Sequence, residues 1–101
     1  MGKDLYISTL LDVYGEFLSE KQRTVTEHYY NDDLSLSEIA ENEGITRQGV
    51  NDLIKRSEIQ LKAMEERCRY AENFSKLKRL SEEYKSGKNV IDDIISIIGD
   101  L

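Results

Sequence analysis

The chain of 101 residues contains no proline, and its apolar residues recur at spacings of three and four along most of its length. This period matches the turn of an α-helix, and no segment shows the sustained alternation of a half-buried strand. The sequence therefore predicts an all-α fold, a small helical bundle. At this length we expect one domain over residues 1–101, with a helical core at about 19–61 and a helical extension at about 62–101.

Short polar residues and one glycine mark the predicted ends of the first helices. Ser19 with Gln22, and Ser35 with Glu38, have the spacing of capping boxes, in which each side chain bonds a backbone N–H at the helix start. Asn31, Asp32 and Asp33 form a turn cluster. We expect helices from Asp4 to about Leu18, from Ser19 to about Tyr30, from Ser35 to Gly44, and from Thr46 onward.

The fourth helix is predicted to be long, because an apolar seam keeps its register from Val50 to Ala71 in alternating steps of four and three. The seam drifts near Asn73, where we expect a kink or short break, and Gly87 ends the segment. Asn89 then begins an amphipathic C-terminal helix. Its β-branched residues lower helix propensity, so it needs a surface on which to dock.

The stretch from Leu36 to Lys55 has the steric pattern of a helix-turn-helix. Gly44 permits a sharp turn, and Ala40 is small where the second helix crosses the first. The apolar wedge between the two helices is expected to consist of Ile39, Val50 and Leu53. An ordinary helical hairpin with a glycine turn shares these features and is the alternative.

In a helix-turn-helix, the second helix presents the outward side chains of its N-terminal part to the major groove of DNA. Arg47 has the donors that read guanine, and Gln48 or Asn51 has the pair of groups that reads adenine. Asp52 lies on the same outward side of this helix. The candidates for phosphate contact are Thr46, Ser37 and Lys55.

The charge distribution opposes binding to duplex DNA. Residues 1–45 carry 3 basic and 10 acidic side chains, a net charge of −7, whereas residues 55–79 carry 8 and 4, a net charge of +4. Phosphate neutralisation supplies much of DNA affinity, so contact would have to be confined to a basic strip. Four cations at seven-residue spacing are predicted to form such a basic strip along a single helix edge. They are Lys55, Lys62, Arg69 and Lys76. The alternative is that they are ordinary solvent-exposed charges without a partner.

Patterns typical of enzymes and metal sites are absent from the sequence. His28 and Cys68 are single residues of their types, too few for a zinc site or an internal disulfide. There is no phosphate-binding glycine loop, so we expect neither enzyme activity nor a cofactor. The apolar runs are too short to span a bilayer and no export signal is visible, which predicts a cytoplasmic protein without membrane insertion.

The run from Leu18 to Leu61, with its contiguous LSLSEIAENEGITRQGV, resembles the fourth region of bacterial sigma factors. Together with DLYISTLLDVYGEFL, it resembles the YlxM family of small bacterial proteins. The resemblance implies five or six helices, a sigma-like helix-turn-helix and a regulatory role in the signal recognition particle pathway. It also implies, as partners, the GTPase of that particle or its RNA.

Position by position, the resemblance to the sigma factors is partial. Arg47 and Gln48 match the start of the sigma DNA-reading helix, whereas Asn51 and Asp52 depart from its more basic pattern. Gly49 stands where alanine is usual, which weakens the helix by about 1 kcal/mol.

Two functions are consistent with these features. The first is an accessory protein of the signal recognition particle pathway built on a helix-turn-helix, and the second is a sequence-specific, dimeric DNA-binding regulator. A homodimer is compatible with both, because the isoleucine-rich C-terminal end and the seam from Val50 to Ala71 offer apolar faces. The alternative is that these faces cover each other within one chain.

Overall fold

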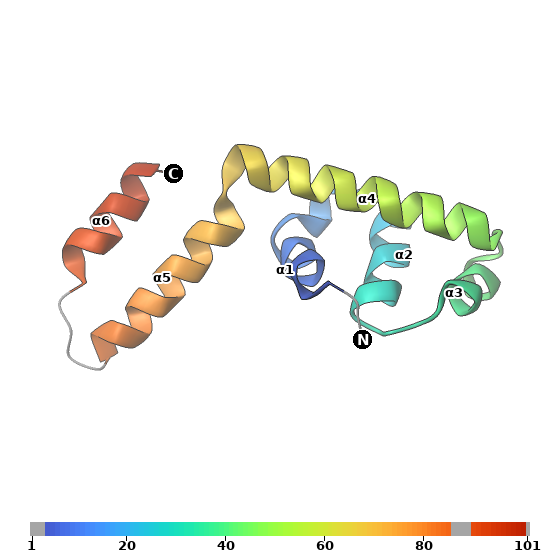
Figure 1. The fold of residues 1–101 in the computed structure, drawn as a ribbon, viewed down its shortest axis with the longest axis horizontal. Helices are drawn as coiled ribbons and strands as arrows, with labels where there is room; N and C mark the ends of the chain where they lie inside the picture. The colour runs from blue at the N-terminus through green and yellow to red at the C-terminus, as the bar shows by residue number, and fades with distance from the viewer. Residues whose placement is uncertain (1–3, 86–89, 101) are drawn as a thin grey trace. The chain divides into compact units, whose positions relative to one another are not determined.

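The computed structural model describes residues 4–85 and 90–100, and within these ranges it contains helices and no strand (Figure 1). The elements are α1 (Leu5–Tyr14), the short 3-10 helix η1 (Gly15–Phe17), α2 (Glu20–Tyr30), α3 (Leu36–Glu43), α4 (Arg47–Cys68), α5 (Tyr70–Lys85) and α6 (Ile91–Asp100). The all-α prediction is confirmed. None of the helices in these ranges has the length and apolarity needed to cross a bilayer.

The chain forms two compact units, Met1–Met64 and Glu65–Leu101. The first holds α1, η1, α2, α3 and most of α4, and the second holds the end of α4 with α5 and α6. The expectation of a single domain over residues 1–101 stays a prediction. Gly87 and Asn89, expected to end one helix and begin another, lie outside the described residues.

The predicted helix starts of the first unit are confirmed. Ser19 Oγ accepts the Gln22 N–H at 3.2 Å, and Gln22 Oε1 accepts the Ser19 N–H at 3.3 Å. Ser35 and Glu38 make the same reciprocal pair at 3.1 and 3.0 Å. Asp4 caps α1 by accepting a backbone N–H at 2.9 Å. These bonds satisfy donors that have no partner in the first turn of a helix.

The first helix ends earlier than Leu18. α1 stops at Tyr14 and continues as one 3-10 turn from Gly15 to Phe17, closed by a bond from the Leu18 N–H to the Gly15 carbonyl at 3.1 Å. Glycine is a weak helix former, which favours this change of winding. The extended backbone at Leu18 then leads directly to the Ser19 cap.

The helix-turn-helix is present, and its elbow lies at Gly44, between α3 and α4. Gly44 ends α3 in the left-handed region with φ 68°, and the Ile45 N–H bonds the Ala40 carbonyl at 3.1 Å. α2 and α3 lie on the same side of α4 (Figure 1), where their apolar residues form one cluster. Its buried members are Val25, Ile39, Ala40, Val50 and Ile54, with Leu53, Ile45 and Leu36 packed against them.

Two polar contacts also tie α2 to α4. Gln22 Nε2 donates to Gln60 Oε1 at 2.8 Å. The Tyr30 hydroxyl donates to the Glu58 carboxylate. Burial of the Tyr30 ring, followed by the bond to Glu58, raises the pKa of the phenol well above its ordinary value, so it stays a neutral donor.

A break follows the long helix as expected, but it lies at Arg69 and not near Asn73, which is inside α5. α4 ends at Cys68, and Arg69 adopts a left-handed conformation with φ 56° before α5 begins. The apolar register from Val50 to Ala71 is therefore not carried by one continuous helix.

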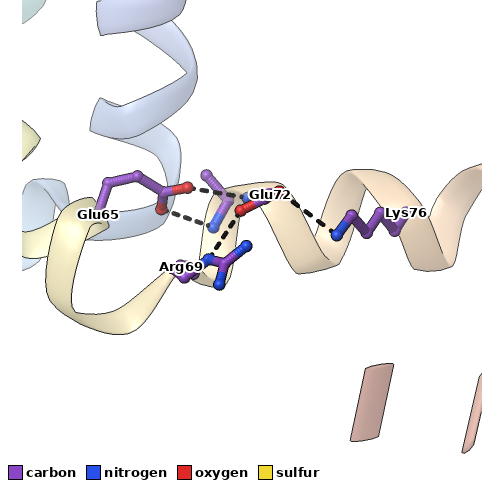
Figure 2. A network of polar contacts seen from close by, with 5 residues as sticks. Glu65, Arg69, Glu72 and Lys76 are labelled. Carbon is purple, nitrogen blue, oxygen red and sulfur yellow. Dashed lines mark hydrogen bonds and ion pairs between the residues drawn. The ribbon is translucent and has the colours of Figure 1, made fainter. Parts of the chain in front are cut away.

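A side chain caps the new helix start, as Figure 2 shows. The two carboxylate oxygens of Glu65 accept the N–H groups of Ala71 at 3.0 Å and Glu72 at 3.1 Å. Arg69 Nε donates to Glu72 at 2.9 Å, and Lys76 Nζ lies 3.3 Å from the same carboxylate. Satisfying the first donors of α5 in this way stabilises a break that contains neither glycine nor proline.

The second unit is a helical hairpin. α5 and α6 run antiparallel beside one another (Figure 1) and bury Leu80, Val90 and Ile97 between them, with Leu77 and Ile94 packed against this cluster. The predicted amphipathic C-terminal helix is present as α6, docked by one of its faces.

Replacing Gly44 by alanine should lower the free energy of unfolding by about 1 kcal/mol, because the left-handed backbone conformation is unfavourable for alanine and not for glycine. A Cβ at this position would meet no atom within 4 Å, so the cost comes from the backbone alone. Gly15→Ala is the matched control, since its φ is −55° and its Cβ would make only ordinary contacts. Urea unfolding followed by circular dichroism measures both; equal stability of the two variants would contradict a left-handed elbow.

Replacing Glu65 by alanine should loosen the start of α5, because two backbone donors lose their acceptor, at a cost of about 1–2 kcal/mol. Hydrogen exchange of the Ala71 and Glu72 amides measures this, with an expected acceleration of about tenfold or more. Glu66→Ala, an exposed neighbour on the same helix, is the control. Unchanged exchange in Glu65→Ala would show that the carboxylate does not cap α5.

Candidate helix-turn-helix contact surface

The elbow fixes the N-terminus of α4 and turns its first residues outward. Thr46 Oγ1 accepts the Gly49 N–H at 2.9 Å, which confirms Thr46 as the helix cap. Its oxygen lone pairs are thus used partly within the helix, while its hydroxyl proton could still reach a phosphate. The predicted contact of Thr46 with phosphate stays a prediction.

Gly49 has a packing role beside this cap. A Cβ placed on it would lie 3.2 Å from Thr46 Oγ1 and 3.8 Å from Ile45 Cδ1. The first distance is tighter than an ordinary contact, so an alanine would press on the hydroxyl that caps the helix. The glycine weakens the helix but leaves room for the cap.

Three of the predicted contact residues come together in one open pocket on the surface. Arg47, Gln48 and Asn51 from the first turns of α4 line a pocket of about 440 Å³, and Leu36 at the start of α3 completes its wall. Arg47 and Gln48 are exposed, whereas Asn51 and Leu36 are partly buried. We call this feature the contact pocket: it offers a cation, two amides and one apolar wall.

Asp52 controls the orientation of one of these amides. Gln48 Nε2 donates to Asp52 Oδ1 at 2.9 Å, one helical turn away. This bond holds the Gln48 amide nitrogen against the helix surface, so its carbonyl oxygen is left as the group that can accept from a ligand. Asp52 also places a negative charge on the outward side of α4.

The helix that precedes the contact pocket is acidic. α3 carries Glu38, Glu41 and Glu43 and has no basic residue. Glu38 is used in the capping box of α3, and Glu43 lies 3.0 Å from Lys21 Nζ. In DNA-bound helix-turn-helix proteins this first helix crosses the phosphate backbone, where such carboxylates are repelled.

The predicted basic strip along one helix edge is wrong in its geometry. Lys55 and Lys62 are exposed on α4, but Arg69 is the non-helical residue after α4 and Lys76 belongs to α5. The left-handed residue ends the helix, so the seven-residue register is not continued past it. A partner contact by any of the four cations stays a prediction.

Arg69 and Lys76 are brought together through one carboxylate (Figure 2). Glu72 accepts from Arg69 and pairs with Lys76, and the bond to Arg69 is the main reason why the pKa of Glu72 is lowered and that of Arg69 raised. Arg69 is exposed and Lys76 is partly buried, and Glu72 offsets the charge of both locally. Lys55 and Lys62 of the first unit are therefore the better candidates for contact with an anion.

Sequence reasoning missed Leu36 as a wall of the contact pocket and Glu65 as the cap of α5. Leu36 directly follows the Ser35 cap, so its apolar character in a first helical turn was the available signal. Glu65 gave none, because its role depends on where the helix breaks. Across residues 4–85 and 90–100, no three His, Cys, Asp or Glu side chains converge in a way that would hold a metal ion.

Comparison with known proteins agrees with this architecture. A family model described as "UPF0122: Putative helix-turn-helix protein, YlxM / p13 like" matches residues 1–100. A UPF0122 protein of Clostridium kluyveri is 45% identical over 100 residues, which cover 99% of this chain and 85% of the relative.

More distant relatives align over a similar span. A UPF0122 protein of Clostridium acetobutylicum is 38% identical over 95 residues, covering 94% of this chain and 82% of the relative. One of Shouchella clausii is 40% identical over 85 residues, covering 84% and 78%. With the helix-turn-helix in the fold and the family model along almost the whole length, the chain belongs to the UPF0122 family of YlxM/p13-like helix-turn-helix proteins.

Proposed function

We propose that this protein is an accessory protein of the signal recognition particle pathway, and that its helix-turn-helix contacts the GTPase of the particle or its RNA. The observation that carries the proposal is a contact pocket with helix-turn-helix residues set in an acidic surface. Arg47, Gln48 and Asn51 offer specific polar contacts, while the surroundings are unsuited to a long phosphate backbone. The link to the particle comes from the resemblance to the YlxM family.

The electrostatics favour a small, local contact. Residues 1–45 carry a net charge of −7, and α3 beside the pocket contributes three glutamates. A duplex docked along α3 and α4 would bring many phosphates close to these carboxylates. A protein surface, or a few unpaired nucleotides reaching Arg47, would avoid most of that repulsion and still use the pocket.

One observation favours the second candidate, a dimeric DNA-binding regulator. Arg47 and Gln48 are both exposed in the first turn of α4, the place from which such helices read base edges. Under this alternative, Arg47 would contact guanine, and Lys55 would contact a phosphate. Duplex DNA therefore belongs in the test as an equal competitor.

The test is a parallel titration of the purified protein against the particle's GTPase, its RNA and duplex genomic fragments at physiological salt. We expect binding to the GTPase or the RNA, and Arg47→Ala should weaken it about tenfold, which corresponds to about 1.4 kcal/mol. Arg67→Ala is the matched control, because it removes the same exposed cation from the last turn of the same helix.

Two results would overturn the proposal. One is the absence of binding to both particle components. The other is sequence-selective retention of duplex DNA that is lost in Arg47→Ala, which would establish the DNA-binding candidate instead.

The role of Asp52 can be tested separately. Asp52→Asn keeps an oxygen that accepts from Gln48 and removes one negative charge from the outward side of α4. We expect non-selective binding of duplex DNA to strengthen by about threefold to tenfold at low salt, with the gain lost as salt rises. Fluorescence anisotropy over a salt series measures it.

Asp12→Asn is the control for this experiment, since it makes the same change in net charge at an exposed position of α1. If both variants gain equally, the repulsion comes from total charge and Asp52 has no local role.

A further inference from the structure

The hairpin of α5 and α6 has a small core for an ordered unit. Among residues 65–85 and 90–100, its cluster buries Leu80, Val90 and Ile97, with Leu77 and Ile94 partly buried beside them. Helices of 16 and 10 residues are marginal in water without packing against an apolar surface. The hairpin would therefore be stabilised by packing its exposed apolar surface against another surface.

Large apolar side chains remain exposed on both helices. On α6, the isoleucines at positions 91, 95 and 98 are 57%, 60% and 59% exposed and form a stripe beside the buried one. On α5, Phe74 is 54% exposed and Tyr70 is 44% exposed, and their rings lie 6.2 Å apart. Exposed stripes of this kind on a small protein mark interaction surfaces.

Helix geometry places the two stripes on the same side of the hairpin. On each helix, the exposed apolar residues lie about a quarter turn away from the buried apolar residues. The turn has the same direction on both helices when each is followed from its N-terminus. α5 and α6 are antiparallel and face each other with their buried residues. The same quarter turn on each helix therefore brings both exposed stripes to the same side of the plane that contains the two helices. Tyr70, Phe74, Ile91, Ile95 and Ile98 thus form one surface, the apolar hairpin face.

The charges on α5 and α6 limit which surface can pack against the apolar hairpin face. α6 contains three aspartates and no basic residue, whereas α5 contains Lys76, Lys78, Arg79 and Lys85 against three glutamates. Helix periodicity places Asp92 beside the isoleucine stripe of α6, and Lys78 and Lys85 beside the aromatic stripe of α5. A suitable cover is therefore apolar and carries a cation that meets Asp92. The first three helices, with the net charge of −7 in residues 1–45, would repel α6. A second α5 has the required apolar stripe and the required cations.

We propose that the apolar hairpin face binds the same face of a second copy of this chain. A two-fold axis parallel to the helices lays α6 of one copy on α5 of the other, forming a four-helix bundle. In this arrangement Asp92, beyond the isoleucine stripe of α6, faces the basic edge at Lys78 and Lys85 of the opposite α5. The other two-fold arrangement, with α6 on α6, pairs two helices that each carry three aspartates and no basic residue.

The assembly state of the full chain gives the first test. Sedimentation equilibrium should show a dimer, and Ile95→Glu should weaken it at least tenfold, because a carboxylate enters an apolar interface. The control is Ile59→Glu, which places the same charge on an equally large side chain, 70% exposed on α4. Circular dichroism reports whether each variant keeps its helix content.

The second test exchanges charges across the proposed interface. It does not require a carboxylate to be placed in an apolar surface. Lys78→Glu and Asp92→Lys each place like charges across the interface, so each alone should weaken the dimer by about threefold to tenfold. Mixed in equal amounts, the two variants should form a heterodimer with near wild-type affinity, because opposite charges then face each other at both contacts.

These outcomes separate a second copy from other covers. A wild-type chain that stays monomeric, or a mixture that shows no recovery, would overturn the proposal, and the apolar hairpin face would then be covered within one chain or by another protein. Equal weakening by Ile59→Glu and Ile95→Glu would overturn it as well. The result is independent of which component the contact pocket binds.

Discussion

The left-handed conformation of Gly44 is the constraint on which the first unit depends. It ends α3, lets the next backbone N–H return to Ala40, and sends the chain into α4 within three residues. Only then do Ile39 and Val50 meet in one buried cluster with Val25 of α2. The same turn holds Arg47 and Gln48 outward, so the contact pocket is a consequence of backbone geometry at a single glycine.

Shape and charge lead to different expectations for this surface, and the proposed function follows from both. The elbow, the cap at Thr46 and the exposed start of α4 are those of a DNA-reading module. The acidic α3 and Asp52 oppose a phosphate backbone along the same surface. A scaffold can keep its fold while its surface is adapted to another partner, because packing and surface charge are set by different residues.

Much of the architecture could be predicted from sequence because its determinants are local. Both capping boxes, the Gly44 turn and the small Ala40 act through residues within a few positions of one another. The contact pocket was predictable in part: Arg47, Gln48 and Asn51 follow from helix periodicity, but Leu36 joins them only through the crossing of α3 and α4.

The break at Arg69 was not predictable in the same way. An arginine gives no sign of a left-handed conformation, and the Glu65 carboxylate that caps α5 acts across six and seven residues. A heptad pattern continues through the break undisturbed, so periodicity alone placed Arg69 and Lys76 on the wrong element. Side-chain capping outweighed periodicity at this joint.

The close approach at Gly49 has an evolutionary consequence. A Cβ there and the hydroxyl of Thr46 compete for the same space, at 3.2 Å. A homologue with the better helix former alanine at position 49 therefore needs the capping side chain at position 46 to shift by a few tenths of an ångström. Substitutions at these two sites should be inherited as a correlated pair, although neither residue belongs to the apolar cluster.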